Sequence, residues 1–598
     1  MARLMIASLK AGIRLPLIAG AIALGLYAVA LGNPYTLRVL TVSGVYALLV
    51  IGYQFIFGYA GALSLAQGTF FGLGAYVTGI LGSQLGWSFP TTFPLSVVAA
   101  GALAVVVAAP VLRLESHYFA LATLGIGQVV LLAGVNWQGV TGGANGIPGV
   151  PGVVILGQPV ARGLPMLAFV WGFVGLGALV AWQIMRGLYG RTFQVMRENA
   201  IAALAIGIDI GRLRLVAFAL SAVYGGAAGA LYVHTIGVIS PEVLEFPIMV
   251  ACLTMAVVGG RARVSGAIVG AVLLVHLPEW FRFLEKSHLI AYGAALLVAI
   301  VAAPWGLVGA LERLRERLFP EEAAAGPAPL RLAPRRRPAQ AASPLLEVEG
   351  VGIAFGGVKA VDGVGFAIGR GEVVGMIGPN GSGKTTLVNL ITGLYRPERG
   401  RIRLSGRDIA GEPPFRIARL GVARSFQNIN LVEELTALDN VAVARAEAEG
   451  AGLGAALLAG SVDRSLARAR AQAMGLLEAI GIGAVAARPC GALPHGLRRG
   501  IEIARALALE PALLILDEPA AGLSEAEQAG LASRLAALAE EGLTLLVIEH
   551  NMPFLMQLAR RVICLDDGWI VATGSPQEIR SDPRVVEAYL GLPRISSR

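Results

Sequence analysis

The first half of the sequence contains almost no charged residues. No Asp, Glu, Lys or Arg occurs from Val39 to Leu112, from Ser116 to Ala161, or from Gly163 to Met185. Charged residues make up 15% of the whole chain and hydrophobic residues 56%, a composition unusual for one soluble body. Because an apolar helix of about 20 residues spans a bilayer, the first half is predicted to cross a membrane several times.

Cysteine is also scarce. The three cysteines, Cys252, Cys490 and Cys564, lie far apart in the sequence, without the paired spacing of a disulfide framework or a metal site. This pattern suits a membrane span and a reducing cytosol. Neither a disulfide scaffold nor a cysteine metal centre is therefore expected.

Hydropathy predicts an all-α membrane domain of about ten spans. They are expected at 13–31, 39–57, 62–84, 92–112, 117–135, 164–185, 215–237, 246–260, 264–281 and 289–310. The first ends in Ala28-Val29-Ala30, which mimics a signal cleavage site, but we interpret it as retained because more spans follow directly. Basic residues after the sixth, eighth and tenth spans favour cytoplasmic ends there.

The net charge of +9 raises nucleic-acid binding as an alternative. The excess basic residues, however, cluster beside the predicted spans, where they mark the cytoplasmic side. These residues are Arg186, Arg191, Arg197, Arg212 and Arg214 in one loop, then Arg313, Arg315, Arg317, Arg331 and 335–337. The predicted partners are therefore a lipid bilayer and no nucleic acid.

Glycine and histidine within the spans have two interpretations. The pairs Gly68/Gly72 and Gly225/Gly229 favour close helix packing in lipid, although broken helices could instead build a substrate path. His234 and His276 are expected to be hydrogen-bond partners between helices, with a functional role as the alternative. The sequence does not identify the residues that line a path.

A segment rich in Pro, Ala and Arg, 311–344, joins this half to the second half. It lacks apolar periodicity and is predicted to be a linker. Beyond it, strands are predicted at 346–355, 372–377, 512–516 and 543–549, alternating with helices. This pattern indicates an α/β domain with a largely parallel sheet. The predicted domains are thus a membrane domain at 1–310, the linker, and an α/β domain at 345–598.

The strongest motif in the second half is "GPNGSGKTT", which follows an apolar strand and opens a helical pattern at 383–394. It fits the P-loop pattern, in which backbone N–H groups surround a β-phosphate. Lys384 would reach the β- and γ-phosphates, and the Thr385 hydroxyl would bind Mg²⁺. The predicted nucleotide-binding residues are Gly378, Pro379, Asn380, Gly381, Ser382, Gly383, Lys384, Thr385 and Thr386. A chance match in a glycine-rich chain is the alternative, which the strand–loop–helix context disfavours.

Two acidic residues end another apolar strand, "LLILDEP". Asp517 is expected to hold Mg²⁺ through water, and Glu518 to orient and deprotonate the attacking water. The alternative is an acidic cap on the helix predicted at 524–540. Further on, His550 ends the strand in "LLVIEHNM", where a sensor of the γ-phosphate would be needed.

The P-loop, "ARSFQNIN", "LPHGLRRGIEIARAL", "LLILDEPAAGL" and "IEH", in this order, resemble the nucleotide-binding domain of ABC transporters over residues 346–594. The resemblance implies that Phe355 stacks on the adenine of ATP. It implies that Gln427 contacts the metal and the attacking water, and couples the nucleotide to the membrane part. It also implies that His550 is the switch histidine and 521–524 the D-loop. The implied signature residues are Leu493, Pro494, His495 and Gly496.

Two positions depart from the ABC pattern. Pro494 replaces the usual signature serine, so no hydroxyl is present there to contact the partner's γ-phosphate. Ser524 replaces the usual D-loop aspartate. Proline suits a helix start, and a free helix N-terminus still favours phosphate, so we expect a working but weaker signature.

A finer resemblance covers both halves. "FGGVKAVDGVGF", "DEPAAGL" and "DPRVVEAYLG" are similar to one ATPase subunit of the branched-chain amino acid importers. "GYAGALSLAQGTFFGLGAY", "YFALATLGIGQ", "TGGANGI" and "RENAIAALAIGIDIGRLRLVAFALSA" are similar to their permease. The resemblance implies a permease fused to an ATPase in the bacterial inner membrane, with the ATPase in the cytoplasm.

The implied partners are a second permease subunit, a second ABC ATPase subunit, a periplasmic substrate-binding protein and a small-molecule substrate. Residues 198–212 would form a helix that seats on the ATPase near Gln427; an ordinary basic loop is the alternative. Urea, short amides or aromatic carboxylates are alternative substrates within the family. An ABC exporter and a membrane ATPase that moves no solute are the rival functions.

Overall fold

The computed structural model of the chain describes residues 33–112, 116–155, 157–281, 293–294, 296–298, 301–318, 343–448 and 459–590. It divides into two compact units. The first contains Met1–Met185 and Gly211–Glu321, and the second contains Arg186–Ile210 and Glu322–Arg598. Residues 186–210 of the basic loop are therefore part of the same unit as the α/β domain, whereas Arg212 and Arg214 belong to the first unit.

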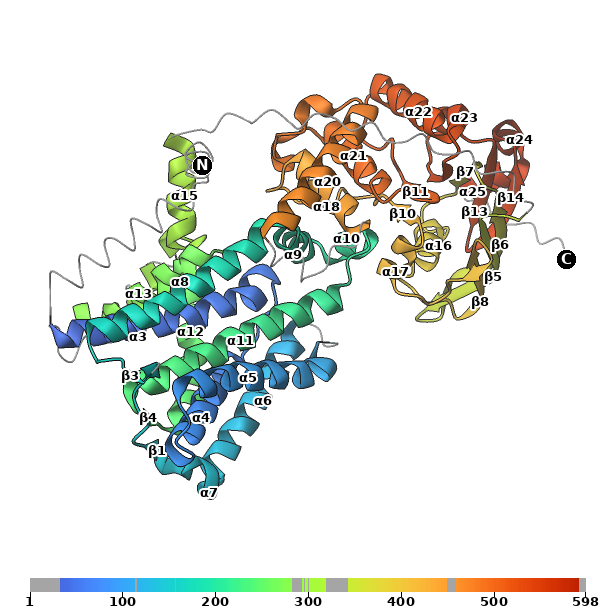
Figure 1. Ribbon diagram of the computed structural model, residues 1–598. Helices are drawn as coiled ribbons and strands as arrows, with labels where there is room; N and C mark the ends of the chain where they lie inside the picture. The colour runs from blue at the N-terminus through green and yellow to red at the C-terminus, as the bar shows by residue number, and fades with distance from the viewer. Residues whose placement is uncertain are drawn as a thin grey trace. The chain divides into compact units, whose positions relative to one another are not determined.

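Helices make up most of the first unit (Figure 1). The longer ones are α3 (Pro34–Tyr53), α4 (Gln67–Gln84), α5 (Phe89–Val111), α6 (Ser116–Asn136), α8 (Leu164–Arg186), α11 (Ile210–Ile236), α12 (Phe246–Gly259), α13 (Val264–Trp280) and α15 (Gly306–Leu318). Every span predicted between residues 39 and 281 coincides with one of these helices. The span predicted at 13–31 and most of the predicted linker lie outside the described residues. Of the span predicted at 289–310, residues 289–292, 295, 299 and 300 lie outside them.

The number of spans is smaller than predicted over the described residues. Five helices are long and apolar enough to cross a membrane, or up to six if a bent pair counts as one span. That pair is α12 and α13, which meet at an angle of 118°. The 14 residues of α12 reach only about 21 Å, short of the roughly 30 Å of a bilayer core. Gly260, with φ of 132°, makes the break.

Close helix packing explains the glycines of α4 and α11. A Cβ atom on Gly229 would collide with the Phe71 carbonyl oxygen, and one on Gly74 would collide with the Gly226 carbonyl oxygen. Only glycine lets the two backbones approach so closely. The packing interpretation is thus confirmed for Gly225 and Gly229, since a Cβ atom on Gly225 would also lie 2.8 Å from Phe70 Cβ. A Cβ atom on Gly72 would collide with the Leu244 side chain, whereas one on Gly68 would make ordinary contacts at 3.7 Å or more, so close packing does not require glycine at that position.

Both histidines of the spans have hydrogen-bond partners. The predicted contact between helices is found for His276, which lies near Ser43 of α3, whereas His234 bonds to Pro151 in a loop. His234 Nδ1 lies 2.7 Å from the Pro151 carbonyl oxygen. His276 Nδ1 lies 2.8 Å from the Val272 carbonyl oxygen and 3.3 Å from Ser43 Oγ. Each ring therefore satisfies at least one polar atom inside the helical unit.

The second unit contains two sheets. One has six strands in the order β10-β11-β12-β7-β13-β14, parallel except for β14. The other has four antiparallel strands in the order β6-β5-β8-β9. The strands are β5 (Leu346–Phe355), β6 (Val358–Ile368), β7 (Val373–Ile377), β8 (Arg399–Leu404), β9 (Arg407–Asp408), β10 (Val422–Arg424), β11 (Leu513–Asp517), β12 (Thr544–Ile548), β13 (Arg561–Asp566) and β14 (Trp569–Gly574).

One predicted strand belongs to a different sheet from the others. The segment 346–355 was expected in the parallel sheet, but β5 pairs antiparallel with β6 and β8. Its burial pattern is mixed, whereas every residue of β7, β11 and β12 is buried. A strand covered on both faces is typical of the centre of a parallel sheet, and β5 lacks that pattern.

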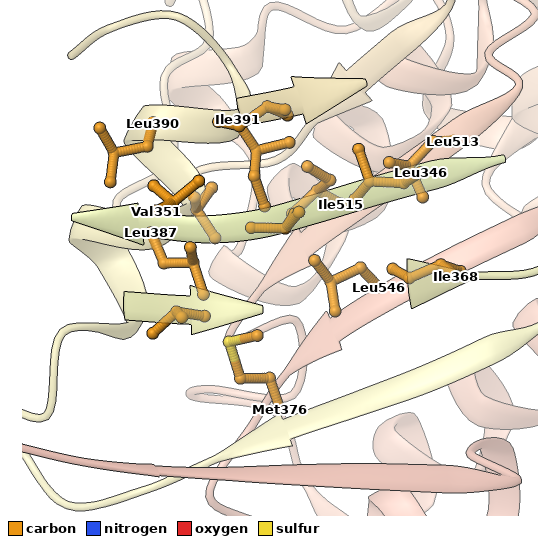
Figure 2. Close-up of a cluster of buried hydrophobic side chains, with 14 of the residues drawn as sticks. Leu346, Val351, Ile368, Met376, Leu387, Leu390, Ile391, Leu513, Ile515 and Leu546 are labelled. Atoms are coloured by element: carbon orange, nitrogen blue, oxygen red, sulfur yellow. The ribbon is translucent and has the colours of Figure 1, made fainter. Parts of the chain in front are cut away.

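Eleven helices of the described residues complete this unit. They are α9 (Leu188–Glu198), α10 (Ala200–Ala205), α16 (Lys384–Ile391), α17 (Pro414–Arg419), α18 (Ala437–Ala448), α20 (Ala459–Ala479), α21 (His495–Leu507), α22 (Glu525–Glu540), α23 (Met552–Leu558), α24 (Pro576–Ser581) and α25 (Pro583–Leu590). A hydrophobic core packs α16 between the two sheets; Figure 2 shows Leu387 and Ile391 of that helix beside Leu346, Met376 and Ile515 of the strands. This packing fixes the start of α16, where the P-loop ends.

Candidate nucleotide site and coupling segment

Three of the predicted motifs begin where neighbouring parallel strands end. In register, Asp517 of β11 pairs with Ile548 of β12, and Ile548 pairs with Met376 of β7. Parallel strands carry their carboxyl ends to one edge, so the P-loop, Asp517-Glu518 and His550 all leave the sheet there. Ligands of open α/β sheets bind at this edge.

Glycine conformations shape the P-loop. Gly378, Gly381 and Gly383 have φ values of 151°, 85° and 97°, which disfavour other residues. A Cβ atom on Gly378 would collide with the Leu565 carbonyl oxygen, and one on Gly383 with that of Ala360. The loop therefore needs glycine for its backbone and for its close neighbours. N–H groups in a glycine-rich loop at the start of a helix are suited to bind an anion, which is the role predicted for this loop.

Lys384, the first residue of α16, places its ammonium inside the P-loop. Its Nζ donates hydrogen bonds to the carbonyl oxygens of Gly378 at 2.7 Å and Pro379 at 2.8 Å. Ser382 Oγ accepts a third, at 3.3 Å. Burial lowers the pKa of Lys384, and the nearby Glu518 and Asp517 carboxylates oppose this shift. The cation thus lies where the loop would surround a phosphate.

Asp517 is a buried carboxylate whose Oδ2 accepts no hydrogen bond within the described part of the chain. Arg424 Nη2 lies 3.8 Å from that oxygen. Burial raises the pKa of Asp517, and Arg424 opposes the shift. An unsatisfied carboxylate oxygen fits a hard cation such as Mg²⁺, which prefers oxygen ligands. Among the described residues, no three His, Cys, Asp or Glu side chains are placed so that together they could hold a metal ion. Such an ion would therefore also need hydroxyl, amide, water or phosphate oxygens as ligands.

Glu518 adopts an unusual backbone conformation. Its φ of 48° lies in the left-handed region, which costs a residue with a Cβ atom about 1–2 kcal/mol. A hydrogen bond of 2.9 Å from its N–H to the Ile548 carbonyl oxygen holds this turn. Its Oε2 accepts a hydrogen bond of 3.3 Å from Gln427 Nε2. The structure therefore brings together the two residues predicted to handle the attacking water.

The alternative role for the acidic pair, a helix cap, is not observed. The cap of α22 is Ser524, whose hydroxyl accepts from Glu527 N–H at 3.4 Å, while its own N–H donates to Glu527 Oε2 at 2.9 Å. This reciprocal pair is a capping box. Ser524, which stands where the D-loop aspartate is usual, therefore has a local structural role that an aspartate would also fill.

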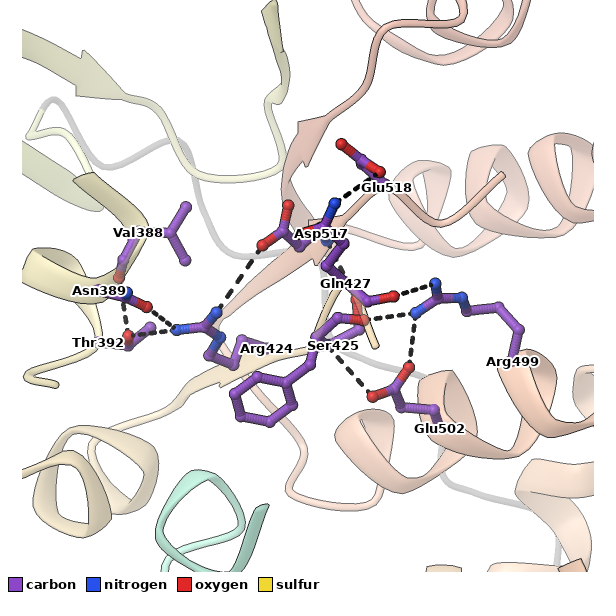
Figure 3. Close-up of polar contacts among 11 residues, drawn as sticks. Val388, Asn389, Thr392, Arg424, Ser425, Gln427, Arg499, Glu502, Asp517 and Glu518 are labelled. Atoms are coloured by element: carbon purple, nitrogen blue, oxygen red, sulfur yellow. Dashed lines mark hydrogen bonds and ion pairs between the residues drawn. The ribbon is translucent and has the colours of Figure 1, made fainter. Parts of the chain in front are cut away.

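Sequence reasoning missed Arg424, which links the P-loop helix to Asp517 (Figure 3). Its Nη1 donates to Asn389 Oδ1 at 2.7 Å and to Thr392 Oγ1 at 3.1 Å, both at the end of α16. Its guanidinium also lies 4.4 Å from the centre of the Phe426 ring. A single arginine in a short strand carries no sequence signal of this role.

Sequence reasoning also missed a buried ion pair that ties the signature helix to the Gln427 loop (Figure 3). Arg499 Nη1 donates to the Phe426 carbonyl oxygen at 2.6 Å, and Nη2 donates to that of Gln427 at 2.8 Å. Glu502 accepts from Arg499 Nη1 at 2.8 Å and from the Phe426 N–H at 3.2 Å. Both side chains are 1% exposed, so α21 holds the loop through contacts shielded from solvent.

The signature residues begin α21. Pro494 is its N-cap residue and is exposed, as is His495, whereas Leu493 is buried. A Cβ atom on Gly496 would lie 2.7 Å from Glu527 Oε1, and one on Gly522 would lie 3.2 Å from the His495 ring. The signature and the D-loop are therefore neighbours, and the structure does not bring them into contact with the P-loop of the same chain among the described residues.

Another missed residue is Glu549, which organises the loops on either side of it. Its Oε1 accepts from the Ala520 N–H at 2.7 Å, and Oε2 accepts from the N–H groups of His550 and Asn551 at 3.1 and 3.3 Å. Glu549 is buried, but the His550 side chain is 65% exposed. The carboxylate thus anchors the backbone while the imidazole faces outward.

Phe355, the predicted adenine contact, lies at the end of β5 and is 45% exposed. Its ring packs edge-on against Tyr395, with ring centres 5.2 Å apart. An exposed aromatic face can stack on a base. Of the remaining predicted residues, Asn380, Gly381 and Thr385 are exposed, and Pro379 and Thr386 are half-buried.

The coupling segment, residues 188–205, packs on the α/β domain through polar contacts from α9. Arg191 Nε lies 3.3 Å from Asp439 Oδ1, and Arg470 holds the same carboxylate at 2.8 and 2.9 Å. Burial raises the pKa of Asp439, but the two arginines outweigh this and hold it below its usual value. Gln194 Nε2 donates to Glu434 Oε2 at 3.2 Å.

The prediction of a single helix at 198–212 is wrong. Asn199 breaks it, with φ of −148°, and caps the six-residue α10 by accepting from Ala202 N–H at 2.8 Å. Asn199 Nδ2 also donates to Asn430 Oδ1 at 2.7 Å, three residues beyond Gln427. Ile201 and Ala205 of α10 line a small cavity with Arg424 and Phe426. The coupling segment thus reaches the predicted location near Gln427, but part of its contact comes from α9, which precedes the predicted range of 198–212.

Comparison with known proteins decides the family. A sequence profile described as "Branched-chain amino acid transport system / permease component" matches residues 35–303, and the profile "ABC transporter" matches residues 361–521. A third, "Branched-chain amino acid ATP-binding cassette transporter", matches residues 570–591.

Among curated relatives, the high-affinity branched-chain amino acid transport ATP-binding protein BraF of Pseudomonas aeruginosa is 42% identical over 254 residues, 42% of this chain and 98% of BraF. The protein LivG of Escherichia coli strain K12 is 40% identical over 250 residues, 42% of this chain and 98% of LivG. The chain belongs to the branched-chain amino acid ABC transporter family.

Within that family, this chain is a membrane permease fused to an ATPase that couples ATP hydrolysis to transport. A solved nucleotide-free ATP-binding cassette from an ABC transporter is 30% identical, with 41% of this chain and 98% of that chain covered and a TM-score of 0.37. The matches to BraF and LivG cover the ATPase half of the chain, and the permease profile covers the other.

Proposed function

We propose that this chain is the fused permease and ATPase of an importer that takes up branched-chain amino acids delivered by a periplasmic binding protein. The observation that carries the proposal is that permease and ATPase profiles of one transport system lie on one chain. The contacts of the coupling segment with the ATPase support it, because transport requires a mechanical connection between the two. We place the permease in the bacterial inner membrane and the ATPase in the cytoplasm.

In the proposed cycle the P-loop N–H groups surround the β-phosphate of ATP, and Lys384 leaves the loop carbonyl oxygens to contact the β- and γ-phosphates. Glu518 accepts the proton of the water that attacks the γ-phosphate. Gln427, hydrogen-bonded to Glu518, orients that water. His550 contacts the γ-phosphate, which its exposed ring is able to reach.

Asp517, Thr385 and Gln427 would hold Mg²⁺ in this site. The orphaned Asp517 oxygen supports this assignment, as do the hydroxyl and amide oxygens of the other two residues. When bound, Mg²⁺ neutralises the charge that develops on the phosphate oxygens. Phe355 would stack on the adenine.

The proposed assembly contains a second permease and a second ATPase. The signature residues Leu493, Pro494, His495 and Gly496 would contact ATP held by the partner ATPase. Their position beside the D-loop, together with the exposure of Pro494 and His495, supports a surface for another subunit. The free N-terminus of α21 favours phosphate even without a signature serine.

Uptake by reconstituted vesicles tests the proposal. The chain is assembled with a second permease, a second ATPase and a periplasmic binding protein for branched-chain amino acids. Uptake of labelled leucine, isoleucine and valine is then measured with ATP on the ATPase side. We expect uptake that requires ATP and is lost in Lys384→Ala. Uptake of urea, short amides or aromatic carboxylates instead would reject the substrate assignment, and ATP-driven efflux would identify an exporter.

A further inference from the structure

The C-terminal part of the ATPase contacts the P-loop at two points. Tyr589 of α25 accepts a hydrogen bond of 3.0 Å at its hydroxyl from the Gly378 N–H. Gly568, in the turn between β13 and β14, donates a hydrogen bond of 3.1 Å to the Ser382 carbonyl oxygen. Both contacts come from elements that follow the nucleotide motifs in sequence, and neither residue is assigned a role above.

The Gly378 contact occurs where the P-loop leaves the sheet. The ladder between β7 and β13 ends with the pair Ile377 and Cys564, so the next N–H, that of Gly378, lies beyond it. Gly378 is buried, and a buried N–H without a partner costs free energy. The Tyr589 hydroxyl accepts the hydrogen bond of this N–H, a role that a carbonyl oxygen of the neighbouring strand would have within the ladder.

Both the N–H and the carbonyl oxygen of Gly378 form hydrogen bonds with side chains. Its N–H bonds to Tyr589, and its carbonyl oxygen accepts from Lys384 Nζ at 2.7 Å. When Lys384 turns to the phosphates of a nucleotide, the carbonyl bond is given up and the Tyr589 bond remains. The tyrosine is then the side chain that keeps Gly378 in its glycine-specific conformation, with φ of 151°.

We propose that Tyr589 is a positioning residue of the nucleotide site, through which the C-terminal helix α25 sets the affinity of the P-loop for ATP and ADP. The hydroxyl holds the start of the loop in the shape that surrounds the β-phosphate, which both nucleotides carry. This inference rests on the nucleotide site proposed above. The Tyr589 side chain is 46% exposed, so removing its hydroxyl leaves no cavity in the core.

Equilibrium titration of the purified full-length chain with fluorescent ATP and ADP analogues tests this role. We expect Tyr589→Phe to weaken both nucleotides by about three- to tenfold, the range that one neutral hydrogen bond contributes. One nucleotide should still bind per chain, and the thermal unfolding midpoint should be unchanged. Glu587→Ala, an exposed position on the same helix, is the matched control and should bind like the unaltered chain.

Each outcome decides the question. Equal affinities for Tyr589→Phe and the unaltered chain would overturn the proposal. So would a reduced number of binding sites or a lower unfolding midpoint, because the tyrosine would then serve folding. A chain ending at Asp582, which lacks α25, should lose affinity at least as strongly as Tyr589→Phe. If the unaltered chain and Lys384→Ala bound nucleotide equally, the nucleotide site itself would be misplaced, which is a separate failure.

Discussion

Four consecutive residues, 424–427, each contact a different part of the ATPase. Arg424 bonds to the end of α16, and Ser425 Oγ accepts from the Asp517 N–H at 3.1 Å. Phe426 bonds to α21 through Glu502, and Gln427 bonds to Glu518. These residues share one stretch of backbone, and Arg424 and Phe426 line a cavity with Ile201 and Ala205 of α10. We expect a displacement of α10 to reach all four contacts through this stretch.

The substitution Glu518→Gln distinguishes a role in ATP hydrolysis from a role in ATP binding. Glu518→Gln keeps the size of the side chain and the contact with Gln427, but an amide cannot accept the proton of the attacking water. We expect ATP binding to persist and hydrolysis by the assembled complex to fall at least a hundredfold, since general bases contribute about 10²–10⁴-fold. Lys384→Ala is the contrasting variant, which should lose nucleotide affinity instead. Hydrolysis by Glu518→Gln at the parent rate would contradict the catalytic role.

We expect the buried ion pair of Arg499 and Glu502 to contribute to the stability of the ATPase domain. Arg499→Met leaves Glu502 buried without this partner and removes two bonds to the Gln427 loop. Breaking a buried ion pair costs about 3–5 kcal/mol, so we expect the free energy of unfolding of the ATPase domain to fall by that order. The double variant Arg499→Met/Glu502→Leu should recover part of the loss, because no unpaired charge remains. Chemical denaturation monitored by circular dichroism measures both, and a double variant less stable than the single would contradict this account.

At the scale of the elements, we expect the contact between the coupling segment and the rest of the ATPase unit to depend mainly on the ion pair of Arg191 and Asp439. Arg191 and Asp439 are 17% and 10% exposed, whereas Glu434, which pairs with Arg197 at 3.7 Å, is 66% exposed. Solvent screens the pair of Arg197 and Glu434, and exposed ion pairs contribute little to the free energy of an interaction. Arg191→Glu would also place two carboxylates side by side. The segment should therefore release the ATPase in Arg191→Glu but not in Arg197→Ala.

A cleavable linker allows the association of the permease half with the ATPase half to be measured. A protease site inserted between residues 319 and 342 separates the halves, and co-purification reports whether they stay associated. We expect association to persist after cleavage in the unaltered chain and in Arg197→Ala, and to be lost in Arg191→Glu. Dissociation of the unaltered halves would mean that the linker, and not the coupling segment, keeps them together.

The elements that the sequence predicts well are those marked by one strong local pattern, such as a continuous apolar run or the P-loop motif. The fully buried strands β7, β11 and β12 lie within one residue of their predicted bounds. The P-loop helix begins within one residue of its predicted start and ends three residues before its predicted end. The coupling helix was mispredicted because Asn199 both breaks α9 and caps α10, and asparagine alone does not show which occurs. The sheet of β5 and the bend at Gly260 depend on packing between distant segments, which local patterns do not contain.

The same distinction applies to the site. Motif residues such as Lys384 and Asp517 were predictable because their chemistry requires a fixed spacing. Arg424, Arg499, Glu549 and Tyr589 act through contacts with residues far away in sequence, and their types are common at any position. The residues that position the catalytic groups could therefore be found only in the folded chain.

At the scale of the whole molecule, the remaining question is how many copies of this chain a working transporter contains. Its P-loop and its signature belong to different elements. The resemblance to ABC transporters implies that ATP is held between the P-loop of one ATPase and the signature of another. The relatives reported above resemble one type of ATPase subunit, and the permease profile covers one permease. The replacement of the signature serine by Pro494 also suits a pair of unequal sites. These features favour assembly with a different permease and a different ATPase over a pair of identical chains.

We therefore expect weak ATPase activity from the chain purified alone, because its P-loop would lack a facing signature from the proper partner. Co-expression with a second permease and a second ATPase should raise the activity at least tenfold. Light scattering of the detergent-purified chain should give the mass of one copy, and that of the co-expressed assembly should add the partner subunits. Lys384→Ala in the co-expressed assembly is the control that ties the gain to this chain's own P-loop. A stable species of two copies, with ATPase activity stimulated by the binding protein in the absence of other subunits, would reject the mixed assembly in favour of a homodimer.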